Sequence, residues 1–369
     1  MYWEPLLQDI TYLLLYGGVI MLAVMAALYL LFRRGNAIAQ DVTSPVRLRH
    51  WAAAFLLADA ISHISWFVGL GYPIKGDTMV GYWVCCCVDV VVLLPTMMGT
   101  LLAMLQDRRR PVWPFAAALL PAVIASVFCI LFRNGAFLVP ATAYVWLVVV
   151  LFIVYLVFEV RRYGRWLRDN YADLEHKEIR YSILVLTFFM LFIFLYTFSQ
   201  SPFTAYLLQV NDLVLSYLLL WRVETLQLLS AETPQAEETV PAEPEPALAA
   251  NQITLPANIG PLLEKYCEEG GLYLQHDITL SQLAREIGTN RYYLSQYFAR
   301  QGLTYNAYIN GLRIRHFIRL YHEAIADHRV FTAQQLAFES GFHSYGTFSA
   351  SFKQQKGKTV TAWMQASSE

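Results

Sequence analysis

Several polar or ionisable side chains lie inside long apolar runs of this chain, and the types of five of them suit ligand binding or proton transfer. These five are Asp59, His63, Asp89, Asn211 and Asp212. Such side chains are costly in hydrocarbon, so they face a protein interior or a water-filled cavity and often mark ligand or proton sites. We therefore predict that they form a signal-sensing site for a small ligand or a proton. The alternative is a structural polar cluster that fixes the packing of the helices.

The spacing of the first two residues favours one shared site. Asp59 and His63 lie four residues apart, which places both side chains on one face of a helix. Asp89 is expected at a similar depth in the next apolar run, whereas Asn211 and Asp212 belong to the last one.

Catalysis and metal binding find no support in the sequence. The chain has no HExxH, GxSxG or phosphate-loop motif, so we expect no catalytic residues, no enzyme activity and no cofactor. Cys85, Cys86 and Cys87 are consecutive, so their thiols point about 100° apart on a helix and do not easily close on one ion. We therefore expect no metal site.

The apolar runs that must position the polar residues are long enough to cross a bilayer. The chain has 369 residues, of which 57% are hydrophobic, and a mean hydropathy of +0.40. Its runs approach the roughly 20 residues that span about 30 Å of hydrocarbon as a helix. They cover residues 11–32, 51–71, 79–105, 113–132, 141–160, 181–199 and 206–221. We predict a seven-helix transmembrane sensor domain over residues 1–222.

Basic residues in the short loops predict the orientation of this bundle. The loops 33–50, 106–112 and 161–180 hold thirteen Lys and Arg residues, whereas the alternating loops hold only Lys75 and Arg133. Cytoplasmic loops carry the excess of positive charge. We expect the N-terminus outside and the C-terminus in the cytoplasm, with the lipid partner being the inner membrane of a bacterium.

A linker is predicted between the membrane part and the rest of the chain. The apolar helical pattern of the last run continues through Leu226 and Leu229, and residues 230–251 then contain five Glu, four Pro and no Lys or Arg. Such a segment cannot bury an apolar face. Residues 223–251 are therefore expected to be a short helical extension followed by a disordered, acidic, Pro-rich linker.

Residues 252–369 have ordinary composition and the pattern of two helix-turn-helix units. In the first, apolar residues recur at helical spacing up to Ile287, Gly288 ends the helix, and Asn290 can cap the next. In the second, Gly341 forms the turn and Ser344 the cap. The segment "YNAYINGLRIRHFIRLYHEAI" between them predicts an amphipathic helix about 30 Å long. That length is close to the roughly 34 Å between successive major-groove faces of DNA.

Residues 278–364 resemble the DNA-binding domain of the AraC/XylS family of transcription regulators. The resemblance rests on "LSQLAREIG", on "YYLSQYFARQGLTYNAYINGLRI", and on "GF" followed by "FSASFKQQKGKT". It implies an all-α domain with two helix-turn-helix motifs and double-stranded promoter DNA as the partner. With the apolar runs, the predicted fold class is all-α: a polytopic seven-helix transmembrane bundle plus a cytosolic AraC-type domain over residues 252–369.

The resemblance also implies which residues contact DNA. The first recognition helix would present Arg291, Tyr292, Ser295 and Gln296. The second would present Tyr345, Thr347 and Ser349 to the bases and Lys353, Lys356 and Lys358 to the phosphates. Gln pairs with adenine, and Arg pairs with guanine or phosphate. The chain departs from the family pattern at Gly346, Ala350 and Val360, so we expect the second helix to position the domain more than to read bases.

These observations predict a membrane-embedded one-component regulator that binds promoter DNA in response to a signal sensed in or at the membrane. A homodimer is a further expectation. The net charge of residues 252–369 supports DNA binding only mildly, since eleven Lys and Arg against nine Asp and Glu give +2. The alternative is a seven-span transporter or receptor whose cytosolic helical domain binds protein.

Overall fold

The computed structural model describes residues 6, 8–33, 35–40, 42–71, 78–174, 177–193, 201–229 and 259–368. In these ranges the chain is helical and has no β-strand, only one isolated bridge between Tyr171 and Thr279. The all-α prediction is therefore confirmed for the described part of the chain.

The chain divides into two compact units. The first consists of Met1–Arg162 and Ile179–Ala231, and the second consists of Tyr163–Glu178 and Glu232–Glu369. This division differs from the predicted boundaries: the first unit extends to Ala231, and Tyr163–Glu178, the end of one long helix and the residues after it, belongs to the second unit. The predicted linker over residues 230–251 lies outside the described residues.

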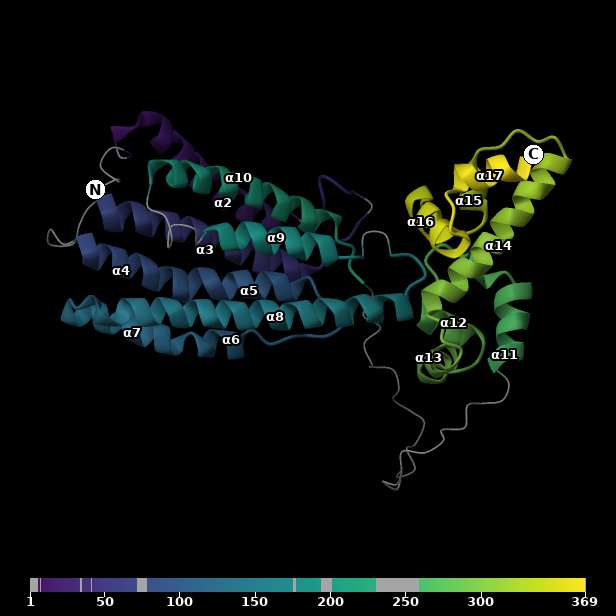
Figure 1. The fold of residues 1–369 in the computed structure, drawn as a ribbon, viewed down its shortest axis with the longest axis horizontal. Coiled ribbons are helices and arrows are strands. Elements are labelled where there is room, and N and C mark those ends of the chain that lie inside the picture. The colour runs from purple at the N-terminus through teal and green to yellow at the C-terminus, as the bar shows by residue number, and fades with distance from the viewer. Residues whose placement is uncertain are drawn as a thin grey trace, which may run out of the picture. The chain divides into compact units, whose positions relative to one another are not determined.

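The first unit is a bundle of long helices that run side by side (Figure 1). In chain order they are α2 (Ile10–Phe32), α3 (Val46–Gly71), α4 (Thr78–Val88), η1 (Asp89–Leu93), α5 (Leu94–Ala103), α6 (Trp113–Ala118), α7 (Leu120–Phe132), η2 (Gly135–Phe137), α8 (Leu138–Asn170), α9 (Arg180–Phe192) and α10 (Pro202–Thr225). The helix α3 lies centrally, since it packs against α2, α4, α5 and α10.

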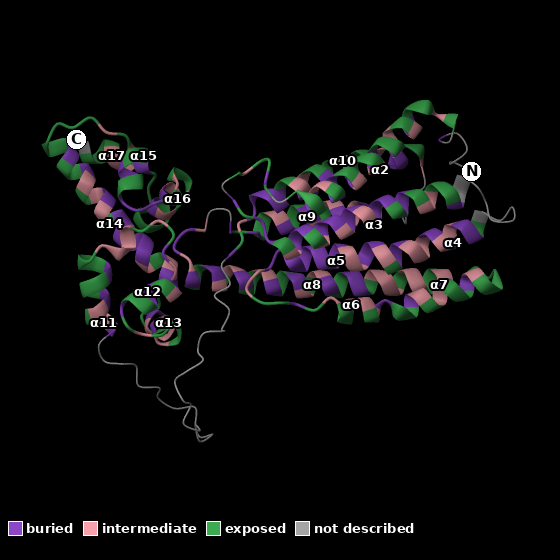
Figure 2. Ribbon diagram, turned by 180° about the vertical axis from the view of Figure 1, so that it is seen from behind, coloured by how far each residue is buried: buried purple, intermediate pink, exposed green. Residues whose placement is uncertain are grey.

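Five helical stretches of the first unit are long and apolar enough to cross a membrane. They are Ile10–Phe32, Val46–Gly69, Met79–Ala103, Gly135–Asn170 and Pro202–Thr225. Exposed apolar side chains cover the outer sides of these helices, as at Leu14 on α2 and Val139 on α8, and Figure 2 shows exposed residues along α7 and α8. These five stretches coincide with five of the seven predicted spans.

The two other predicted spans do not form single long helices in the described residues. The run 113–132 is divided at Leu119 into α6 and α7, each of which has a proline at its start. A proline has no N–H to donate and is favoured in the first turn of a helix, which explains a new start at this point. The run 181–199 is represented by α9, which ends at Phe192, and residues 194–199 lie outside the described ranges.

A π-helical turn interrupts the third apolar stretch where a polar residue enters the core. The turn η1 begins at Asp89, and Pro95 follows in the first turn of α5. Pro95 cannot donate a backbone hydrogen bond, and the hydrogen bonds before it are spaced as in a π-helix. The N–H of Leu94 thus donates to the carbonyl oxygen of Asp89, five residues earlier. The turn places the Asp89 side chain inside the bundle, where it is 2% exposed.

The last helix of the first unit ends earlier than the sequence pattern predicts. α10 stops at Thr225, and Leu226 is extended. Leu226 and Leu229 are buried, and the N–H groups of Leu228 and Leu229 donate to Thr43 and Gln106 of neighbouring loops. The predicted helical continuation through Leu229 is therefore wrong, because these loop contacts satisfy the backbone in an extended form.

The second unit contains two helix-turn-helix motifs joined by one long helix (Figure 1). Its elements are α11 (Ile259–Leu262), η4 (Leu263–Glu269), η5 (Leu272–Leu274), α12 (Leu280–Glu286), α13 (Arg291–Arg300), α14 (Tyr305–Ala326), α15 (Ala333–Glu339), α16 (Tyr345–Lys356) and α17 (Val360–Ser368). The predicted turns and caps are confirmed. Gly288 and Gly341 have φ values of 73° and 90°, and the side chains of Asn290 and Ser344 cap α13 and α16.

The joining helix α14 belongs to two separate hydrophobic cores. Its first half packs with α12 and α13 through Tyr305, Ile309 and Leu312. Its second half packs with α15 and α16 through Phe317 and Tyr321. Each motif therefore has its own core, and the shared helix fixes the spacing between them.

A buried arginine between these two cores was not predicted. Arg313 of α14 is fully buried, and its guanidinium donates to the carbonyl oxygens of Tyr273, Gln275 and His276. Burial lowers its pKa to about 10, so the group still carries its charge near neutral pH. The guanidinium satisfies three carbonyls of the connection that precedes α12.

Candidate DNA interface and buried polar site

The predicted DNA-contacting residues of the first motif lie on the accessible side of α13. Leu294 and Phe298 turn inward into the core, which leaves the opposite face of the helix to solvent. Arg291 and Tyr292, in the first turn of the helix, are exposed, and Ser295 and Gln296 are half-buried. The four residues are thus at least partly accessible at the start and middle of the helix.

The second motif has the same arrangement on α16. Phe348 and Phe352 face the core, and the predicted base-facing residues are exposed or half-buried. These residues are Tyr345, Thr347 and Ser349. Lys353 and Lys356 in the last turn and Lys358 just beyond it are exposed. Their contacts with DNA remain a prediction.

One predicted reading residue already has a partner within the second unit. The hydroxyl of Thr347 donates to Oδ1 of Asp173 over 3.2 Å. Asp173 follows α8 in the segment Tyr163–Glu178 and is 4% exposed. Nothing in the sequence signals this contact, because Asp173 lies far from residue 347 in a polar stretch of ordinary appearance.

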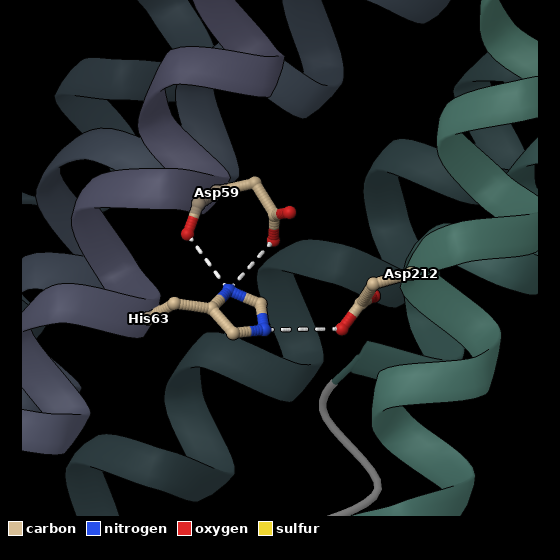
Figure 3. Close-up of side chains that lie close together, drawn as sticks. All are labelled: Asp59, His63 and Asp212. Carbon is tan, nitrogen blue, oxygen red and sulfur yellow. Dashed lines mark hydrogen bonds and ion pairs between the residues drawn. The ribbon is translucent and has the colours of Figure 1, made fainter. Parts of the chain in front are cut away.

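Three of the predicted sensing residues come together in the first unit. Asp59 and His63 lie on α3 and Asp212 lies on α10, all three less than a tenth exposed, and Figure 3 shows the imidazole between the two carboxylates. His63 Nε2 lies 3.3 Å from Asp212 Oδ2, and His63 Nδ1 lies 3.6 Å from Asp59 Oδ1. Asp59 and His63 thus share one helix face, and Asp212 is their partner from the last helix. Their role in sensing stays a prediction.

The hydrogen bonds of His63 fix the orientation of its ring. Nδ1 lies 2.9 Å from the carbonyl oxygen of Asp59, which only accepts, so Nδ1 carries a hydrogen. Nε2 then faces the carboxylate of Asp212, another acceptor. Such a contact is favourable when Nε2 carries a second hydrogen or when a cation lies beside the pair.

The two other predicted sensing residues, Asn211 and Asp89, form hydrogen bonds with the cluster or with residues next to it. Asn211 donates to Oδ1 of Asp212 over 3.1 Å and to the carbonyl oxygen of Phe189 over 3.2 Å. Asp89 accepts from the hydroxyl of Ser62 and, over 3.1 Å, from the indole of Trp66. Ser62 and Trp66 lie near His63 on α3, and their hydrogen bonds connect Asp89 to the cluster.

A cavity of about 60 Å³ lies beside the cluster, walled by α2, α3 and α10 together with η1. Its polar lining includes His63, Asp89, Asp212 and Gln209, and its aromatic lining includes Tyr12, Tyr16 and Trp66. Gln209 was not predicted as a site residue. An amide inside the last apolar run, three positions before Asp212, is nevertheless the same kind of signal that identified Asn211.

The composition of the cluster would also allow a metal ion. One ligand atom from each of Asp59, His63 and Asp212 lies within 4.8 Å of the others. A bound zinc ion needs ligands at about 2.0–2.2 Å, which draws the ligand atoms to within about 4 Å of one another. A shared ion would therefore require the three side chains to move closer together.

Comparison with known proteins gives a match within the second unit. Residues 283–366 match a family model for a helix-turn-helix domain, of the AraC type. No curated protein and no solved structure matches the chain. The C-terminal part is therefore an AraC-type helix-turn-helix domain, which indicates a DNA-binding regulator.

Proposed function

We propose that this protein is a membrane-embedded one-component transcription regulator. It binds promoter DNA through residues 252–369 and senses its signal in the helical bundle of the first unit. The observation that carries DNA binding is the match of residues 283–366 to AraC-type domains, together with two capped helices that present polar side chains. The five long apolar helices support the membrane location.

In this proposal the two recognition helices have different tasks. Arg291 and Gln296 on α13 read base edges, since both side chains can form paired hydrogen bonds with purines. Lys353, Lys356 and Lys358 bind phosphates and hold the domain in register. Gly346 and Ala350 are exposed on α16 and offer no polar side chain, so α16 contributes less to sequence recognition.

The bundle spans the inner membrane of a bacterium seven times in this proposal, with the N-terminus outside and the second unit in the cytoplasm. The pair α6 and α7 forms one of the two shorter spans, and α9 begins the other. The excess of Lys and Arg in the loops 33–50, 106–112 and 161–180 supports this orientation. The regulator acts as a homodimer, because two domains on one promoter bind more tightly than one.

A test uses the full-length protein in lipid nanodiscs and a library of random DNA duplexes. We expect repeated selection to enrich a shared sequence that reaches over two successive major grooves. Retention of no DNA at low salt, together with stable binding of a cytosolic protein, would favour the alternative of a receptor or transporter with a protein-binding domain.

A further inference from the structure

The cavity beside His63 has room for a small molecule. Its volume of about 60 Å³ compares with the roughly 10–15 Å³ that one water molecule requires by the same kind of measure. It lies between helices, as ligand sites in helical bundles do. Ala205 and Leu208 of α10 give one wall an apolar surface.

The polar lining of this cavity includes two carboxylates and one amide oxygen that can accept hydrogen bonds. Asp89 and Asp212 contribute carboxylates, and Gln209 contributes an amide. Gln209 is 4% exposed, and its Oε1 has no hydrogen-bond partner among the described residues. A buried acceptor of this kind calls for a donor from a ligand.

Three hydrogen-bond donors of the lining already have acceptors. Tyr16 donates its hydroxyl hydrogen to the carbonyl oxygen of His63, and Ser62 and Trp66 donate to Asp89. Neither Lys nor Arg occurs among the described residues that line the cavity. A ligand that fits this cavity should therefore donate several hydrogen bonds.

Charge leads to the same conclusion. Asp59 and Asp212 share the single imidazole of His63, so one imidazolium can balance the charge of only one ionised carboxylate. A second buried negative charge is costly, and either a proton or a bound cation removes this cost.

Aromatic side chains complete a site for an organic cation. Tyr12 and Tyr16 line the cavity with ring centroids 5.6 Å apart, and Trp66 lines it as well. The faces of such rings attract ammonium groups.

We propose that this cavity binds a small organic cation with a primary ammonium group. The ammonium donates to Asp212 and to Oε1 of Gln209, and the carbon chain lies against Tyr12, Ala205 and Leu208. A metal ion suits the site less well, because it would need the three side chains to move closer together and would leave the aromatic lining unused. This inference rests on the proposed function, since it names the class of ligand for the proposed sensing site.

The experiment measures thermal unfolding of the full-length protein in nanodiscs with primary alkylammonium ions of one to six carbons. The matched neutral probes are the alcohols of equal length. We expect saturable stabilisation by at least one ammonium ion and none by its alcohol. Asp212→Asn and Gln209→Leu should each weaken the apparent affinity at least tenfold, and Gln209→Glu should strengthen it. Asp169→Asn and Gln8→Leu change exposed residues and should leave it unchanged.

Three results would overturn the inference. One is equal stabilisation by ammonium ions and alcohols, another is stabilisation by Zn²⁺ alone, and the third is a response to acidification with none to any amine. Binding of the selected DNA is measured on the same preparation. Intact DNA binding with no amine response would refute the amine site alone, whereas loss of DNA binding in the unmodified protein would refute the proposed function.

A second inference rests on separate contacts within the second unit. The segment Tyr171–Asp173 is seated on the DNA-binding domain. Ala172 is fully buried, and its carbonyl oxygen accepts from Asn306 and Asn310 of α14. The carboxylate of Asp173 accepts a hydrogen bond from the hydroxyl of Thr347, the third residue of α16.

We infer that this segment competes with DNA for α16. The start of a helix attracts anions, and bound DNA often places a phosphate there. The carboxylate of Asp173 lies beside the start of α16 and accepts the hydrogen bond that the Thr347 hydroxyl could donate to DNA. Release of the segment would therefore free the second recognition helix.

DNA binding by full-length Asp173→Asn and Asp173→Ala proteins tests this competition. Both variants should bind the selected DNA three to ten times more tightly than the unmodified protein, whereas Glu264→Gln, at an exposed position of η4, should not. Unchanged or weaker binding with an unaltered unfolding temperature would show that the contact does not compete with DNA. A lower unfolding temperature without tighter binding would show that Asp173 has only a structural role.

Discussion

His63 Nε2 lies 3.3 Å from Asp212 Oδ2, and this contact joins the central helix α3 to the last helix α10 (Figure 3). The two helices are far apart in the sequence, near opposite ends of the first unit. In the proposed function, a signal acts on this contact and so alters the packing of α10. The contact is therefore the natural place to test sensing.

Replacement of His63 by Leu should destabilise the bundle strongly. The change leaves Asp59 and Asp212 buried without their shared partner, and loss of one member of a buried ion pair costs about 3–5 kcal/mol. Thermal unfolding in nanodiscs measures the effect. Ile64→Leu, at the next and exposed position of α3, is the control and should change the stability little. Equal stability of the two variants would show that His63 does not hold the carboxylates in place.

Asp212→Asn should alter promoter output in cells and leave intrinsic DNA binding intact. The amide keeps the size of the side chain but removes the charge that faces His63. A reporter gene under the selected promoter sequence measures the output, with protein levels checked in the membrane fraction. An unchanged response to every condition that regulates the unmodified protein would count against a sensing role.

Gln296→Ala and Lys353→Ala should have different effects on DNA binding. Loss of a base contact costs about 1–3 kcal/mol and relaxes the preference at one base position. Loss of a phosphate contact weakens all sequences alike and lowers the slope of log K against log salt by about one. Titrations on selected and random duplexes separate the two. Equal losses on both kinds of DNA for both variants would refute the division of tasks.

Arg313→Lys should destabilise the DNA-binding domain despite the retained charge. One guanidinium reaches the carbonyls of Tyr273, Gln275 and His276, and an ammonium does not reproduce this planar arrangement. A buried acceptor left without a donor costs about 1–3 kcal/mol. Arg315→Lys, at an exposed position of the same helix, is the matched control. If thermal unfolding gave both variants the same stability, the three bonds would contribute little.

Reporter fusions test the proposed orientation of the bundle. A fusion after Arg110 should show cytoplasmic activity, and a fusion after Asn134 should show external activity. The two sites lie on either side of α6 and α7. If both fusions gave the same location, this helix pair would not cross the membrane and the seven-span arrangement would be wrong.

Local features could be predicted well from the sequence because they depend on near neighbours. Asn290 and Ser344 cap the helices that follow them, and Gly288 and Gly341 adopt the positive φ that their turns require. Polar residues in apolar runs likewise pointed to the buried cluster around His63, because burial of charge in an apolar setting has few explanations.

Features that depend on distant partners were missed. Arg313 resembles any basic residue on an amphipathic helix, and only the fold brings three carbonyls to it. The end of α10 at Thr225 depends on loops near residues 43 and 106. The contact between Asp173 and Thr347 joins residues 174 positions apart.

Recovery of crosslinked DNA with the full-length protein from intact cells is the most direct test of a membrane-embedded DNA-binding regulator. Cells are treated with formaldehyde, the membrane fraction is isolated, and the DNA bound to the protein is sequenced. We predict a small set of promoter fragments with a common sequence, and we predict that the double change Arg291→Ala and Gln296→Ala abolishes this enrichment while the protein stays in the membrane. DNA recovery no greater than from this variant, or a protein found outside the membrane fraction, would contradict the account.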